Sequence, residues 1–293
     1  MRRHAAIACL IALIVAGCGR PSTPTSKLSI VASFYPLYHF AQEVGGDRVQ
    51  VTNLVPAGSE PHDYELTPQD VANLTRAKVL IYNGAGFEPW VSKLLPQLPD
   101  TIVKVEASQG APLVKEEGTV DPHIWLDPVL AEGQVDNILA GLVRADLDGK
   151  DAYGANARKL KEDLQVLHRR YAEALQKCSK KTFISSHEAF GYLAKRYGLE
   201  MIAISGLSPE AEPSPAKLKE VATLAKRHGV HVIYVETLVS PRMAETIARE
   251  VGAPVRVLDP LEGLSDASLA AGRNYFTVMD ENLRNLLEGF DCR

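Results

Sequence analysis

The chain has 293 residues, of which 46% are hydrophobic and 23% are charged. This balance is typical of a globular protein and excludes a disordered chain, a collagen and a small disulfide-rich scaffold. Lys and Arg number 32 against 36 Asp and Glu, which gives a net charge of -4, and no long basic run is present. A nucleic-acid partner is therefore not expected.

The N-terminus has the pattern of a secretory signal peptide. Arg2 and Arg3 precede an apolar stretch over residues 5–15. This stretch is shorter than the roughly 20 residues that a membrane-spanning helix needs. We therefore predict a cleaved signal peptide over residues 1–17.

A lipid anchor is predicted where the signal peptide ends. Val15-Ala16-Gly17-Cys18 resembles the site at which cleavage makes a lipid-modified cysteine the first residue of the mature chain. The alternative is an ordinary signal peptide followed by an incidental cysteine. Residues 18–27 are rich in Pro, Ser and Thr, and we expect them to form a tether between lipid and domain.

The cysteines point to one disulfide. Of the four in the chain, Cys9 leaves with the signal peptide and Cys18 carries the lipid, so Cys178 and Cys292 remain in the folded domain. Two thiols in an exported chain predict a bond between them. Two buried free cysteines are the alternative.

Short apolar strands alternate with amphipathic helices along the chain. In the first part, we expect strands at residues 28–34, 50–55, 78–83 and 101–105, with helices at residues 37–44 and 67–77. In the second part, we expect strands at residues 182–186, 201–205, 230–236 and 255–258, with helices at residues 190–197, 215–228, 241–251 and 275–289. This alternation predicts an α/β fold with mainly parallel sheets.

One long helix is predicted between these two parts, over residues 151–176. Apolar side chains recur there every three or four residues: Leu160, Leu164, Leu167, Tyr171 and Leu175. We therefore predict two α/β lobes, over residues 28–150 and 178–293, joined by a linker helix over residues 151–177. A single stiff connector predicts smaller lobe movements than a hinged clamshell allows.

Four polar residues are candidates for a metal site between the lobes. His62 and His187 closely follow predicted strands, Asp259 ends another, and His123 lies in a long loop. Ligands of open α/β sheets bind at the carboxyl edge of the strands, so these side chains are expected to face one cleft. Three imidazoles and a carboxylate suit a divalent metal such as zinc. Taken singly, each histidine is more readily explained as a surface or hydrogen-bonded loop residue, and only their joint placement favours a metal site.

Three segments carry a resemblance to a known family. They read DPHIWLDP at residues 121–128, SHEAF at residues 186–190 and VLDPL at residues 257–261. On these segments the chain resembles the metal-binding lipoproteins of zinc and manganese ABC importers, the ZnuA/TroA-like solute-binding family. The resemblance implies two α/β lobes with a backbone helix and a metal held in the cleft by the four candidate residues.

The residue types favour zinc over manganese. In manganese-binding members of the family a glutamate is expected where this chain has His187, and imidazole suits zinc whereas carboxylate suits manganese. The short segment 115–120, however, has no histidine, and many zinc-specific members carry a long His-rich loop there. Zn²⁺ is therefore the predicted metal, with Mn²⁺ as the alternative.

The resemblance implies a transport protein and not an enzyme. We expect a monomer, anchored by lipid on the outer side of a membrane in the cell envelope, that delivers zinc to an ABC permease and its ATPase. The chain has no Walker-type phosphate loop, so its partners must supply the energy. A zinc hydrolase is a weaker alternative, because four protein ligands leave no position for water and no HExxH motif occurs. Nothing in the sequence supports a third alternative, a surface adhesin.

Overall fold

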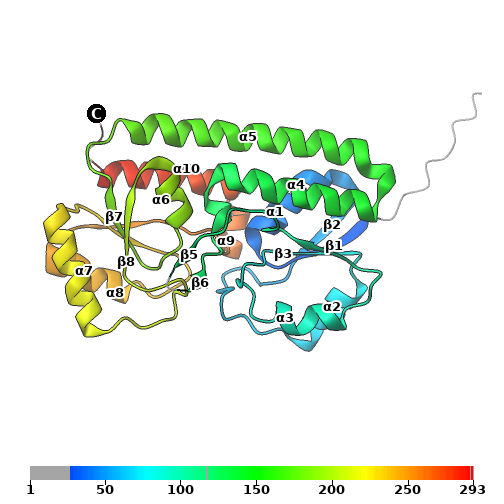
Figure 1. Cartoon of the computed structure of the whole chain (residues 1–293), viewed down its shortest axis with the longest axis horizontal. Helices are drawn as coiled ribbons and strands as arrows, with labels where there is room; N and C mark the ends of the chain where they lie inside the picture. Colours follow the sequence, from blue (N-terminus) through cyan, green and yellow to red (C-terminus); the bar gives the residue numbers. More distant parts are fainter. Residues whose placement is uncertain (1–26, 117, 291, 293) are drawn as a thin grey trace, which may run out of the picture.

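The computed structural model describes residues 27–116, 118–290 and 292 (Figure 1). The predicted signal peptide, the lipid anchor at Cys18 and nearly all of the tether lie outside these residues. Among the helices of the described part, none is long and apolar enough to cross a membrane.

Two four-stranded parallel sheets form the centres of two lobes, as the sequence predicts. The first sheet has the order β2-β1-β3-β4. Its strands are β1 (Leu28–Ala32), β2 (Val49–Asn53), β3 (Val79–Tyr82) and β4 (Val103–Glu106). The second sheet has the order β10-β9-β7-β8. Its strands are β7 (Thr182–Ser185), β8 (Glu200–Ala203), β9 (Ile233–Val235) and β10 (Val255–Val257).

Helices cover both faces of each sheet (Figure 1). The first lobe contains α1 (Tyr35–Gly45), α2 (Pro68–Arg76), α3 (Val91–Leu94) and α4 (Pro128–Ala145). The second contains α6 (Gly191–Tyr197), α7 (Pro215–His228), α8 (Arg242–Val251), α9 (Asp266–Ala270) and α10 (Tyr275–Gly289). A short hairpin of β5 (Lys115–Glu116) and β6 (Thr119–Val120) precedes α4. The longer helices, such as α1, α4 and α10, each bury an apolar face, and this burial stabilises the layered arrangement.

The long helix α5 (Lys150–Gln176) runs along both lobes. It packs against α1 and α4 of the first lobe and against α6 and α10 of the second. The five apolar residues whose spacing predicts the helix are all buried. They belong to one hydrophobic cluster with residues from both lobes, so the lobes share a continuous core along α5.

Helix α4 is absent from the predicted elements. Asp127 lies directly before its first residue, and the Asp127 side chain accepts a hydrogen bond from the Val129 backbone N–H. Pro128 then occupies the first turn of the helix. Its buried face includes small and polar residues such as Gln134 and Gly141, and this weakens the apolar stripe that marks a helix in a sequence.

Direct hydrogen bonds also join the two lobes. The indole Nε1–H of Trp125 donates to the carbonyl of Pro260 at 2.8 Å, and the Tyr275 hydroxyl donates to the Trp125 carbonyl at 2.6 Å. The Arg196 guanidinium donates to Asp127 at 2.8 Å. The first and second lobes are thus held together by direct bonds as well as by α5.

The predicted disulfide between Cys178 and Cys292 is confirmed. It joins the segment that follows α5 to the segment that follows α10. The two cysteines are 114 positions apart in the sequence, so the bond closes most of the second lobe into one loop.

A buried histidine at the interface between α1 and α10 makes stability depend on pH. The His39 ring stacks on Tyr275 and contacts Phe276 edge-on, and its Nε2 has no hydrogen-bond partner among the described residues. Burial lowers the pKa of His39 to about 4, whereas it is about 6.5 in an unfolded chain.

Because the unfolded state binds this proton more readily, stability should fall as the pH falls from about 6.5 to 4. The loss from this one group should be about 3 kcal/mol. Urea unfolding of the metal-free protein measures it, with His39→Phe as the comparison. The wild type should lose about 3 kcal/mol more than the variant between pH 7 and pH 4. Equal losses in the two proteins would contradict the assignment.

Candidate metal centre

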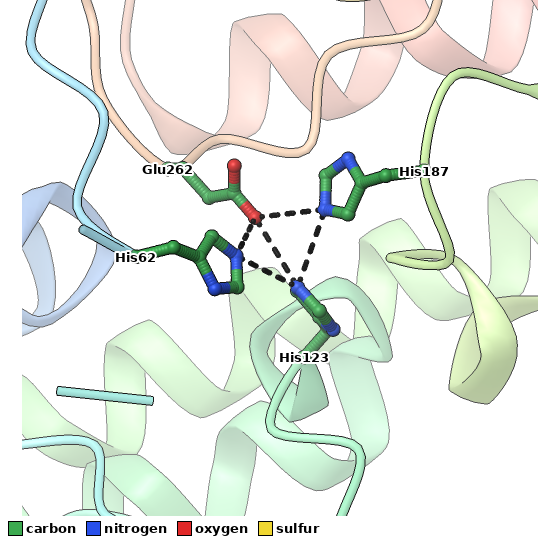
Figure 2. A group of neighbouring side chains, drawn as sticks. All are labelled: His62, His123, His187 and Glu262. Carbon is green, nitrogen blue, oxygen red and sulfur yellow. Dashed lines mark hydrogen bonds and ion pairs between the residues drawn. The ribbon is translucent and has the colours of Figure 1, made fainter. Parts of the chain in front are cut away.

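Three histidines and one glutamate meet between the two sheets (Figure 2). His62 lies in the loop after β2, and His187 lies two residues after β7. Glu262 follows β10, and His123 directly precedes the 3-10 helix Ile124–Leu126. Parallel strands place their carboxyl ends at one edge of a sheet, and here the edges of both lobes contribute to one site.

The four side chains present one ligand atom each to a common point. The Nε2 atom of His123 lies 3.3 Å from that of His62 and 3.4 Å from that of His187. The Oε1 atom of Glu262 lies 3.1 Å, 3.2 Å and 3.2 Å from the Nε2 atoms of His62, His123 and His187. Four atoms placed tetrahedrally at zinc-ligand distances lie about 3.3 Å from one another. Five of the six separations between the ligand atoms are close to this value, and the sixth, between His62 and His187, is within 4.8 Å. The four residues could therefore hold a zinc ion.

The centre is shielded from solvent. The side chains of His123 and His187 are 0% exposed, that of Glu262 is 1% exposed and that of His62 is 9% exposed. His62 is thus the most exposed of the four side chains. The Phe87 ring packs edge-on against His62, with 4.7 Å between ring centroids.

Two carboxylates fix the orientation of two imidazoles. Asp121 Oδ1 accepts hydrogen bonds from the backbone N–H of His123 at 3.0 Å and from its Nδ1 at 2.8 Å. Glu236 Oε1 accepts in the same way from His187, at 3.0 Å and 2.7 Å. With the proton on Nδ1, each Nε2 lone pair is free for a metal.

The side chains of the centre shift one another's pKa values. Burial favours the neutral form of Glu262, yet the surrounding imidazoles hold its pKa well below its usual range. Burial alone would lower the pKa of His187, but the carboxylates of Glu236 and Glu262 raise it well above the ordinary value. The same balance, with Asp121 and Glu262, raises the pKa of His123, whereas burial lowers that of His62. A bound metal would replace the protons on the Nε2 atoms that face Glu262, whereas the Nδ1 protons of His123 and His187 would stay hydrogen-bonded to Asp121 and Glu236.

Asp259, which the sequence predicts as the carboxylate of the metal site, does not belong to the group of three histidines and Glu262. Its Oδ1 accepts a hydrogen bond from the Leu261 backbone N–H, and its Oδ2 accepts one from the Thr237 hydroxyl. Glu262 supplies the carboxylate that meets the histidines. Glu262 is not among the predicted residues, because the prediction rests on closeness to a strand end, whereas Glu262 and His62 both lie several residues beyond the strands β10 and β2.

Removing an orienting carboxylate should weaken metal binding without removing a ligand. Glu236→Ala frees the His187 ring to rotate and to change its tautomer, so zinc affinity should fall about 10–100-fold. A competition titration against a chelator measures this. Glu220→Ala, on the outer surface of α7, is the matched control and should bind zinc as the wild type does. Unchanged affinity in Glu236→Ala would contradict the orienting role.

Comparisons with known proteins agree with this geometry. The family described as "Zinc-uptake complex component A periplasmic" matches residues 30–289. The high-affinity zinc uptake system protein ZnuA of Bacillus subtilis is 41% identical, over 92% of this chain and 92% of its own. The zinc-binding lipoprotein AdcA of Streptococcus pneumoniae is 39% identical, over 97% of this chain and 60% of its own length.

Solved structures of relatives share the fold. The Zn(II)-bound ZnuA-like domain of Streptococcus pneumoniae AdcA has a TM-score of 0.81 and 40% identity, covering 91% of this chain and 100% of its own. The laminin-binding protein Lmb of Streptococcus agalactiae, described as having adhesin and metal-transporting activity, has a TM-score of 0.84 and 36% identity, covering 90% of this chain and 99% of its own. The chain therefore belongs to the family of periplasmic zinc-uptake complex component A.

Proposed function

We propose that this protein captures Zn²⁺ outside the cytoplasm and delivers it to an ABC-type importer in the membrane. The observation that carries the proposal is the buried group of His62, His123, His187 and Glu262, whose ligand atoms all lie within 4.8 Å of one another and mostly at the separations expected around zinc. We assign these four residues as the ligands of the transported metal. Relatives named for zinc uptake and zinc binding support the same cargo.

Zinc is favoured over manganese by the ligand set. Three imidazole nitrogens and one carboxylate oxygen suit zinc, whereas manganese prefers a set richer in oxygen. A tetrahedral arrangement also suits zinc better than the octahedral sites that manganese occupies.

Transport is favoured over hydrolysis by the number of ligands. Catalytic zinc sites keep one position open for water or substrate. Here four protein atoms already surround the common point, and the family is one of uptake proteins. We therefore propose that the protein binds and releases zinc and does not act as a zinc hydrolase.

Membership of the family supports the partners and the location that the sequence predicts. We infer that a permease and its ATPase receive the metal, that the protein acts as a monomer, and that lipid on Cys18 holds it at the membrane. The name of the lipoprotein AdcA supports this anchor.

Metal titration of the full chain tests the proposal. The metal-free protein should bind one equivalent of Zn²⁺ and should prefer it to Mn²⁺ in a competition experiment. A strain lacking the protein should take up less radiolabelled zinc from a zinc-poor medium. A preference for Mn²⁺, or the absence of any tight zinc binding, would refute the proposed cargo.

A further inference from the structure

The backbone that presents Glu262 takes an unfavourable conformation. Leu261, directly before it, has φ 60°, which lies in the left-handed region that residues with a Cβ atom rarely adopt. Leu261 is also fully buried. The surrounding structure must hold this turn in place for Glu262 to point at the three imidazoles.

Asp259 makes the bond that closes this turn. Its Oδ1 accepts a hydrogen bond from the backbone N–H of Leu261 at 2.8 Å. This contact, from an aspartate side chain to the backbone two residues later, is an Asx turn. This hydrogen bond holds Leu261, the residue with the unfavourable φ, which lies one position before Glu262.

Asp259 is itself fixed from two other elements. The Thr237 hydroxyl, after β9, donates to its Oδ2 at 3.1 Å. Asn282 of α10 accepts from the Asp259 backbone N–H at 2.8 Å and donates to its carbonyl at 2.7 Å. Asp259 and Asn282 are 2% and 1% exposed, so water does not compete for these bonds. The start of the turn is therefore anchored to the body of the second lobe.

The two carboxylates of this segment have different surroundings. Both oxygens of Asp259 accept hydrogen bonds within the turn and its support. Glu262 Oε1 instead faces the Nε2 atoms of three histidines, and its Oε2 has no hydrogen-bond partner among the described residues. Of these two carboxylates, Glu262 is the one that lies with the three imidazoles.

We propose that Asp259 is a positioning residue for the metal site: it holds the turn that aims Glu262 at the three histidines and does not bind the metal. This inference rests on the proposed function of the site. The turn requires a hydrogen-bond acceptor of the right length at position 259 and does not require its negative charge. A direct ligand would require the charge.

Substitutions that separate length from charge test the proposal. Asp259→Ala removes the acceptor, and zinc affinity should fall about 10–100-fold, as for other residues that orient a ligand. Asp259→Asn keeps an acceptor of the same length without the charge and should restore nearly the affinity of the wild type. Asp259→Glu keeps the charge but places the carboxylate one methylene further away, so it should remain weak. Glu262→Gln is the reference for loss of a ligand and should be weaker than Asp259→Ala.

The measurements are made on the full chain by chelator competition for zinc, with Co²⁺ absorption as a second readout. Co²⁺ has an intense visible spectrum when four ligands surround it tetrahedrally. We expect this spectrum in the wild type and in Asp259→Asn, and a changed spectrum in Asp259→Ala and Asp259→Glu. A residue that only stabilised the fold would change the melting temperature of the metal-free protein and leave the spectrum of the loaded protein unchanged.

Several results would overturn the inference. Weak binding by Asp259→Asn, whatever Asp259→Glu does, would show that the charge is required. Wild-type affinity in Asp259→Ala would show that the turn holds without this side chain. If Asp259→Ala or Asp259→Glu fails to fold, the isosteric Asp259→Asn variant still decides, because weak binding by it refutes the proposal. Failure of the wild type itself to bind zinc would refute the proposed function, and that result is distinct from any of these.

Discussion

Replacing His123, His187 or Glu262 by alanine should remove most of the stabilisation that zinc gives to the wild-type protein. Zinc that binds only the folded state stabilises it by about 4 kcal/mol at a concentration a thousand times the dissociation constant. Loss of one ligand leaves three atoms around the common point, and affinity then falls steeply because each ligand atom contributes directly to the bond energy. Thermal unfolding with and without added zinc measures the effect in each variant.

His62→Ala completes this series, and a surface histidine provides its control. His228 at the end of α7 pairs with Glu200 on the surface and lies outside the metal group. His228→Ala should therefore keep the full zinc-dependent rise in melting temperature. If all four ligand variants kept the same rise, the metal would have to bind elsewhere in the protein.

Removing the disulfide should cause the second large effect, a loss of about 4–5 kcal/mol in the free energy of unfolding. The bond between Cys178 and Cys292 closes a loop of more than one hundred residues in the unfolded chain. Without it the unfolded state gains conformational entropy, and the end of the chain is no longer tied to the segment after α5. Urea unfolding of the Cys178→Ala/Cys292→Ala double variant, compared with the oxidised wild type, measures the loss.

Reduction of the wild type provides the control for that comparison. The reduced protein should unfold at nearly the same urea concentration as the double variant, because both lack the same loop. Equal stability of the oxidised wild type and the double variant would show that the bond contributes nothing. Zinc binding should be retained in the folded double variant, since neither cysteine belongs to the metal group.

Much of the fold could be predicted because strands and helices of the two lobes have clear periodicities. The buried leucines of α5 recur at helical spacing, so the helix is evident from the sequence. Helix α4 was missed although Ala131, Val135, Ile138 and Leu142 are buried at helical spacing as well. Glycines and polar residues between them obscure the stripe. The pair Asp127 and Pro128 does mark the start of this helix in the sequence, because an aspartate followed by a proline is a common helix start.

The site could be predicted only as far as residue type and strand ends allow. The structure brings His62, His123 and His187 together, as the sequence analysis expects, because each lies at or beyond the carboxyl edge of a sheet. The segment that carries Asp259 and Glu262 contains the left-handed backbone of Leu261, to which we attribute the choice between these two carboxylates. A leucine in the sequence gives no sign of that conformation, because the surrounding tertiary structure imposes it.

Helix α5 limits how an importer could recognise the loaded protein. The helix is anchored in both lobes by the same buried core, so the outline of the molecule should change little when zinc arrives. Zinc held by the four residues would displace protons from the imidazole Nε2 atoms, so the net charge of the site would change by less than the two units of the ion. His62 is the most exposed of the four side chains, so it is the one most accessible to a docked partner. We therefore expect the membrane receptor to respond to the surface around His62, and the angle between the lobes to convey almost no signal.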